Sequence, residues 1–140
     1  MLALGMVGAG LCSADPFHDA ASSGDLARVK VILKAHPKLV DAKDAIGVTA
    51  LDYALSKGHL DVAKFLLAHG ASVKSKDVKA GETPLYYAVM SGRTDAVQLL
   101  LSHNADINAR NTFGGTPLTF AEKSHHPNIA EFLSAHGGHR

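Results

Sequence analysis

Cysteine is nearly absent from this sequence of 140 residues, which contains only Cys12. A single thiol cannot close a disulfide within the chain, so a small fold held by disulfides is excluded, while the compartment stays open. An excess of charge is also lacking, because 14 Lys and Arg residues balance 13 Asp and Glu residues, for a formal net charge of +1. This balance excludes a strong electrostatic footprint for nucleic acid or for an anionic membrane surface.

Long apolar runs are lacking too. Residues 1–14 are uncharged and mostly apolar, but a bilayer span needs about 20 such residues, so no integral membrane span is expected. The stretch is similar to the apolar core of a secretory signal, with small residues at 12–14 before a cleavage point, although no Lys or Arg precedes it. Two alternatives stay open: an export leader of a periplasmic or secreted protein, or an apolar extension packed on the first unit of a cytoplasmic one.

What the chain does contain is a block that recurs about every 33–34 residues. It reads Gly-x-Thr-x-Leu and begins at Gly47, Gly81 and Gly114. Self-similarity at this period indicates stacked supersecondary units, of which about three or more are needed to bury a continuous core. Such a solenoid presents an extended face without a pocket, which favours binding over catalysis.

Each unit is predicted to be helix, turn, helix and loop. Thr49, Thr83 and Thr116 stand where a first helix begins and can accept a hydrogen bond from a free backbone N–H of its first turn. The apolar residues of 60–67 and 96–101 recur at three- and four-residue spacing, which predicts second helices with one buried stripe each.

These motifs resemble the ankyrin repeat. The similarity rests on the Gly-x-Thr-Pro-Leu opening, the Gly-His-Leu-Asp-Val junction at 58–62 and the Leu-Leu-x-His-Gly-Ala ending at 66–71. It implies an all-α ankyrin-repeat solenoid of stacked helix-turn-helix units joined by β-hairpin-like loops. The expected organisation is an apolar leader at 1–14 and a single domain at 15–140, divided into a capping repeat at 15–42 and repeats at 43–75, 76–110 and 111–138.

One position departs from the family pattern in every repeat. Asp52, Tyr86 and Thr119 stand where the family usually has a histidine after the opening leucine, which puts the usual hydrogen bonding there in question. A smaller departure is the loop between 70 and 81, which is one residue longer than its counterpart at 104–114 and predicts a local bulge.

The nine histidines raise the possibility of a metal site. Four of them recur at 33- or 34-residue spacing at the ends of the second helices: His36, His69, His103 and His136. Helices of neighbouring units pack about 8–10 Å apart, so these rings cannot share a zinc ion, whose ligands lie about 2 Å away. No nucleophile, base and orienting group occur together either. We expect no catalytic residues, no metal and no cofactor.

The resemblance implies that a partner protein binds the concave face, which is made by the loop tips and the exposed ends of the first helices. Four residues of this face are apolar although their positions are expected to be exposed: Ile46, Val78, Met90 and Phe113. Exposed apolar side chains of this kind are typical of an interaction site. The alternative is that each side chain packs against its own hairpin. The expected partner-binding residues are Ala45, Ile46, Val48, Ser56, Lys57, Val78, Lys79, Ala80, Glu82, Met90, Ser91, Thr112, Phe113, Lys123 and Ser124.

A column of rings, Tyr53, Tyr87 and Phe120, follows the opening leucines. Packing between repeats is the favoured role, and lining the groove as aromatic hot spots is the alternative.

The sequence as a whole favours a non-catalytic protein–protein interaction module, an adaptor, inhibitor or stabiliser that is a monomer when unbound. A structural spacer or targeting fragment of a larger assembly is the alternative, and a histidine- or metal-dependent enzyme a weaker one.

Overall fold

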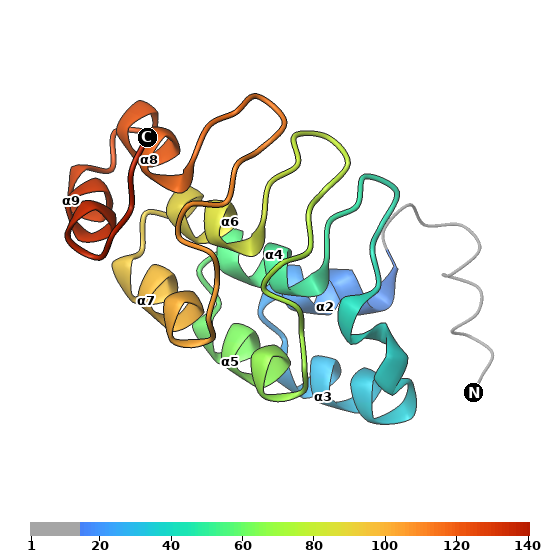
Figure 1. Ribbon diagram of the computed structural model, residues 1–140. Helices are drawn as coiled ribbons and strands as arrows, with labels where there is room; N and C mark the ends of the chain where they lie inside the picture. Colours follow the sequence, from blue (N-terminus) through green and yellow to red (C-terminus); the bar gives the residue numbers. More distant parts are fainter. Residues whose placement is uncertain (1–14) are drawn as a thin grey trace.

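The computed structural model describes residues 15–140, so the leader predicted at 1–14 lies outside the described residues. The described chain forms helix pairs that stack side by side, with the first helices in one row, the second helices in another and the loops projecting together on one side (Figure 1). This arrangement confirms the predicted all-α solenoid. The pairs are α2 (Pro16–Ser23) with α3 (Leu26–Ala35), α4 (Ala50–Ser56) with α5 (Leu60–Ala68), α6 (Pro84–Met90) with α7 (Thr94–Ser102), and α8 (Pro117–Lys123) with α9 (Pro127–Ala135).

The starts of the first helices follow the sequence closely, with one exception. Thr49 and Asp52 form a reciprocal capping box, in which the amide of Asp52 donates to the Thr49 hydroxyl at 3.3 Å and the amide of Thr49 donates to the Asp52 carboxylate at 3.0 Å. Thr116 begins α8 in the same way. Thr83 precedes α6, but its side chain makes no capping bond and its buried hydroxyl has no partner within residues 15–140. The capping role predicted for Thr83 is therefore wrong.

The turns between paired helices need a left-handed residue. Gly24, Gly58 and Gly92 supply it with φ of 77°, 78° and 75°, values that glycine adopts without steric cost. In the last repeat His125 takes this place with φ of 60°, and the amide of His126 still donates to Ala121 at 3.0 Å. The turn between α8 and α9 is therefore kept without a glycine.

The apolar core runs through the whole stack rather than filling one centre. Leu51, Leu85 and Leu118 of the repeated block are buried and pack with the apolar stripes of the second helices. At the C-terminal end Ile129 and Leu133 point inward with 1% and 0% exposure. The outer residues Asn128, Glu131 and Ser134 are exposed, as expected for an end that no further unit covers.

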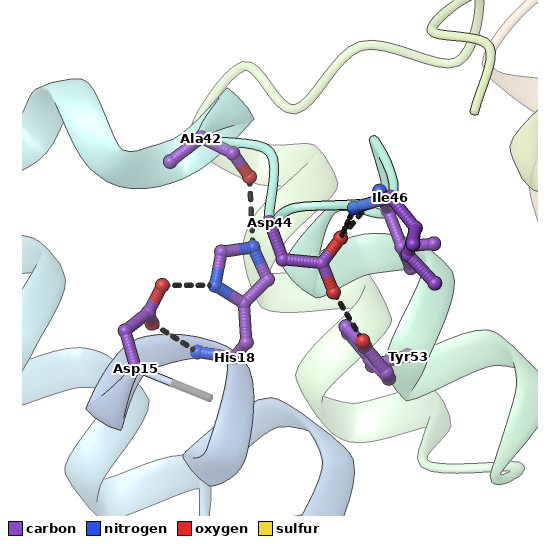
Figure 2. A network of polar contacts seen from close by, with 7 residues as sticks. Asp15, His18, Ala42, Asp44, Ile46 and Tyr53 are labelled. Carbon is purple, nitrogen blue, oxygen red and sulfur yellow. Dashed lines mark hydrogen bonds and ion pairs between the residues drawn. The ribbon is translucent and has the colours of Figure 1, made fainter. Parts of the chain in front are cut away.

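In two of the units, the side chain at the position after the opening leucine, or its equivalent, hydrogen-bonds to the loop that follows. His18 occupies this position in the capping repeat, and its Nε2 hydrogen-bonds to the Ala42 carbonyl at 2.8 Å while Nδ1 lies 2.6 Å from Asp15 (Figure 2). The Tyr86 hydroxyl makes the equivalent link to the carbonyls of Ala109 at 2.6 Å and Gly115 at 2.5 Å. A tyrosine thus replaces the histidine of the family pattern.

Asp52 makes no such link. Its side chain is buried, and its Oδ1 has no partner within the described chain. Burial raises the pKa of this carboxyl to about 7, because a charged carboxylate is poorly solvated there. Asp52 therefore caps its own helix but leaves the connection to the next loop weaker than in the neighbouring units.

Candidate protein-binding face

A groove of about 410 Å³ lies between the loops of the repeats at 43–75 and 76–110. Its walls come from two neighbouring loops and from the exposed sides of α4 and α6. All lining residues except Asp77 and the two tyrosines belong to the predicted partner-binding residues. The lining consists of Ile46, Val48, Tyr53, Ser56, Asp77, Lys79, Ala80, Glu82, Tyr87 and Met90. We call this the inter-loop groove.

Each loop is held in shape by an Asp or Asn at its start. Asp44 accepts from the amides of Ile46 and Val48, both at 3.0 Å, and Asn111 accepts from Phe113 at 3.0 Å and Gly115 at 2.9 Å. Such side chain to backbone bonds are typical of Asx turns. Sequence reasoning missed these residues, although Asp44, Asp77 and Asn111 recur at 33- and 34-residue spacing.

Asp77 likewise accepts hydrogen bonds from backbone amides in the longer loop, whose turn contains one residue more. It accepts from Ala80 at 2.7 Å and Gly81 at 3.0 Å, so its first partner is three residues on rather than two. The loop closes with the Asp77 amide donating to the Glu82 carbonyl at 3.1 Å. This wider turn is the bulge that the loop length predicts.

The loops also stack on one another. The amide of Val78 donates to the Ile46 carbonyl at 3.0 Å, and the amide of Thr112 donates to the Ala80 carbonyl at 2.8 Å. Within the loops of the described chain the only β-bridge is the isolated pair Lys43–Thr49. The predicted hairpin-like loops are therefore present as tight turns that support each other, without extended strands.

Two tyrosines join the groove wall to the loop starts. Tyr53 donates a hydrogen bond to Asp44 (Figure 2), and Tyr87 donates to Asp77 at 2.5 Å. Although partial burial acts to raise it, the hydrogen bond from Tyr53 and those from the loop amides hold the pKa of Asp44 below its ordinary value. Burial and the bond to Asp44 raise the pKa of Tyr53 to about 12. The loop acids thus stay charged and the phenols stay neutral near pH 7.

The ring column therefore divides. Tyr53 and Tyr87 line the inter-loop groove, which is the alternative role. Tyr53 also packs edge-on against His18 of the preceding unit, with ring centroids 5.8 Å apart. Phe120 packs edge-on against Tyr86 of the preceding repeat, with ring centroids 5.8 Å apart. Packing between repeats, the favoured role, is thus found for both Tyr53 and Phe120.

The exposure predicted for the apolar tips is confirmed. Ile46, Val78, Met90 and Phe113 are 48%, 73%, 43% and 80% exposed, so they are not buried beneath their own loops. Ile46 and Met90 both line the inter-loop groove, whereas Val78 and Phe113 lie outside it. Val48 differs from the expectation, because it is only 5% exposed and is held inside its turn by Asp44.

The other predicted residues lie outside the inter-loop groove. Four of them are exposed: Ala45, Lys57, Thr112 and Lys123. Ser91 and Ser124 are half-buried at the ends of α6 and α8. The structure therefore brings about half of the predicted set together in one groove and spreads the rest along the same row of loops and first helices.

The charged groups of the inter-loop groove are two acids and one lysine. Asp77 is 6% exposed, and Glu82 beside it is half-buried. Burial, and then the nearby charge of Asp77, raise the pKa of Glu82 above its ordinary value. Lys79 is the exposed cation of the lining. The groove thus combines apolar walls with a partly buried acidic side.

The recurring histidines end the second helices, as predicted. The ring Nδ1 of His69, His103 and His136 donates to the carbonyl four residues earlier, at 2.9, 3.0 and 2.8 Å. These bonds satisfy carbonyls that a helix end leaves without partners.

Among residues 15–140 no group of three or more His, Cys, Asp and Glu side chains is placed to hold a metal ion. Within the same range, each helix is too short or too polar to cross a bilayer.

Comparison with known proteins agrees with this architecture. The family model for ankyrin repeats (many copies) matches residues 17–67, 51–101 and 85–133. The human NAD-capped RNA hydrolase NUDT12 is 41% identical over 54 residues, which are 39% of this chain and 12% of that protein. Ankyrin repeat and SOCS box protein 2 of Bos taurus is 39% identical over 56 residues, 40% of this chain and 9% of that protein.

A third relative, the ankyrin repeat domain-containing protein 13C-A of Xenopus laevis, is 34% identical over 64 residues, 46% of this chain and 12% of that protein. The chain thus corresponds to about an eighth or less of the length of these relatives, and the activity named for the hydrolase is said of that protein alone. The family matches, in contrast, overlap and run through every helix pair from α2 to α9. The chain therefore belongs to the ankyrin-repeat family.

Proposed function

We propose that this protein is a non-catalytic binding module, an adaptor, inhibitor or stabiliser of another protein, that holds its partner on the face made by the loop tips and first helices. Ankyrin repeats are generally protein–protein interaction modules. The observation that supports this face most strongly is the inter-loop groove, where exposed Ile46 and Met90 belong to one apolar-walled hollow.

Burial of these side chains by a partner would contribute to the free energy of binding. Removing a fully exposed Ile or Met side chain from water contributes about 1.5–3 kcal/mol. Because Ile46 and Met90 are about half exposed in the free protein, their burial by a partner would contribute about half of that free energy. The turns around Asp44 and Asp77 fix the groove before binding, which lowers the entropy lost on association. Phe113, exposed at the next loop tip, extends the same face.

Affinity capture from native extract tests the proposal. The wild-type domain should retain one stoichiometric partner, and the double variant Met90→Ser/Phe113→Ser should lose it while its melting temperature stays close to wild type. Val31→Ser is the matched control, because Val31 is 69% exposed but lies on α3, away from the loops.

Two results would count against this face. Retention of the partner by the Met90→Ser/Phe113→Ser variant would place binding elsewhere on the molecule. Loss of the partner with Val31→Ser would show that exposed apolar surface in general, rather than this face, is responsible. A capture without any stoichiometric partner would favour a structural spacer.

A further inference from the structure

A second groove, of about 440 Å³, lies over the row of second helices. This row of helices lies on the side of the stack away from the loop tips (Figure 1). The groove is formed where α3 and α5 pack together and where the short 3-10 helix η1 (Pro37–Asp41) leaves the end of α3. We call it the α3–α5 groove. Its lining residues are Lys30, Leu33, Lys34, Pro37, Phe65 and His69.

The floor of the α3–α5 groove is apolar and ordered. Leu33 is 4% exposed, and the Phe65 ring is half-buried beside it. The His69 ring lies against Phe65 with centroids 4.1 Å apart, and its Nδ1 is fixed by the Phe65 carbonyl at 2.9 Å. An aromatic ring held on one side in this way offers a flat surface that does not need to be ordered on binding.

The rim carries two cations without acidic partners. Lys30 and Lys34 are one turn apart on α3 and are both exposed. The Lys30 ammonium lies 5.7 Å from the centroid of the Phe65 ring, a distance typical of a cation–π contact. Within residues 15–140 neither lysine forms an ion pair. Positive charge therefore stands beside the apolar floor with nothing in the described chain to neutralise it.

The other repeats show that this combination is not a by-product of the fold. The equivalent positions between α5 and α7 hold Lys64 and Ala68 in place of the two lysines and Leu99 in place of the phenylalanine. The equivalent positions between α7 and α9 keep the ring pair as Phe132 and His136, again with centroids 4.1 Å apart. The residues there in the places of the two lysines are Gln98 and Ser102. Within the described chain, only the α3–α5 groove combines the aromatic floor with two lysines.

We propose that the α3–α5 groove is a second binding site, independent of the inter-loop groove. Its occupant is a segment of a partner protein that places a bulky apolar side chain on the floor and carboxylates beside Lys30 and Lys34. The lysines set the sign of the charge on the partner, since opposite charges across an interface favour the correct partner and exclude others. The groove is open to solvent, whereas small-molecule sites enclose most of their ligand, so a side chain of a larger partner fits it better.

The test uses the full chain and a fluorescent ten-residue peptide with a central phenylalanine flanked by glutamates, read by anisotropy. Binding should be saturable and should weaken as salt rises from about 0.05 to 0.5 M, where screening shortens the reach of surface charges. A peptide with glutamines in place of the glutamates should bind about tenfold more weakly, as expected for the loss of two exposed ion pairs. A lysine-flanked peptide should not bind.

Matched variants locate the site. Lys30→Gln/Lys34→Gln should weaken binding of the acidic peptide about tenfold, whereas Lys64→Gln/Lys74→Gln removes the same charge elsewhere and should leave binding unchanged. Phe65→Leu copies the residue found one repeat on and should weaken binding. Phe132→Leu should have no effect, and neither should Met90→Ser/Phe113→Ser.

Three outcomes would overturn the proposal. The acidic and neutral peptides could bind equally well, the two pairs of lysine variants could lose the same amount of affinity, or the acidic peptide could fail to bind at all. Phenylacetate competing as tightly as the peptide would assign the α3–α5 groove to a small carboxylate instead. Loss of binding in Met90→Ser/Phe113→Ser would show that the peptide occupies the loop face, which tests the proposed function separately.

Discussion

The hydroxyl of Tyr87 donates to Oδ2 of Asp77 at 2.5 Å, while Oδ1 of the same carboxylate accepts from the loop amides of Ala80 and Gly81. Asp77 thus connects the first helix of its repeat to the loop above it. Tyr53 and Asp44 form the same connection one repeat earlier. In the last repeat both partners change together, to Phe120 and Asn111, so the acid is present only where a hydroxyl can donate to it.

Tyr87→Phe should therefore destabilise the domain. It removes the donor from a carboxylate that is 6% exposed, and an unpartnered buried acceptor costs about 1–3 kcal/mol. Denaturation by urea, followed by circular dichroism, measures the change in the free energy of unfolding.

The double variant Tyr87→Phe/Asp77→Asn is the control for this coupling, because it copies the pair of the last repeat. It should be more stable than the sum of the two single changes predicts. Additive losses would show that the two residues act independently.

Asp52 should make stability depend on pH. Its pKa is raised to about 7 in the folded protein, compared with about 3.9 in an unfolded chain. The folded state therefore holds this proton more tightly, so stability is greatest below about pH 4 for this group and falls as pH rises to about 7. The full difference is on the order of 4 kcal/mol.

Asp52→Asn isolates this contribution, since it removes the titration but keeps an oxygen for the Thr49 amide. The variant should gain stability relative to wild type as pH rises from 4 to 8, as measured by urea midpoints across this range. A constant difference between the two proteins would mean that Asp52 does not titrate there.

Tyr86→Phe should weaken the join between the last two repeats. The Tyr86 hydroxyl is fully buried and links to the carbonyls of Ala109 and Gly115, so its loss should cost about 1–3 kcal/mol. Thermal denaturation of the variant should show the lower melting temperature, and amide hydrogen exchange should rise first in α8 and α9. Unchanged exchange in these helices would contradict the role of the hydroxyl in holding them.

His125→Gly should stabilise the protein. His125 is exposed and adopts φ of 60°, a conformation that costs an L-residue about 1 kcal/mol more than glycine, partly offset by the greater freedom of glycine in the unfolded chain. A melting temperature higher by a few degrees is expected. A decrease would show that the imidazole makes a contribution larger than this strain.

Much of the fold was predictable because its signals are local. The opening threonines and prolines, the left-handed glycines and the apolar stripes act within a single helix or turn, and their recurrence sets the register of all four units. The same register correctly placed Ile46, Met90 and Phe113 on the surface. Two local details were missed: Val48 is buried within its own turn, and the Thr83 hydroxyl makes no capping bond to its own helix.

Residues that are adjacent in the chain or repeated at one period are enough to predict the repeat, the helix boundaries, the family and the side of the molecule on which the apolar tips stand. The folded arrangement was needed to show which of those tips share a groove, that Asp52 is buried with an oxygen that has no partner within residues 15–140, and that Lys30 of α3 lies by Phe65 of α5. These features arise between side chains brought together across neighbouring repeats, and burial, charge and hydrogen bonding at such contacts depend on where the packed helices place each atom.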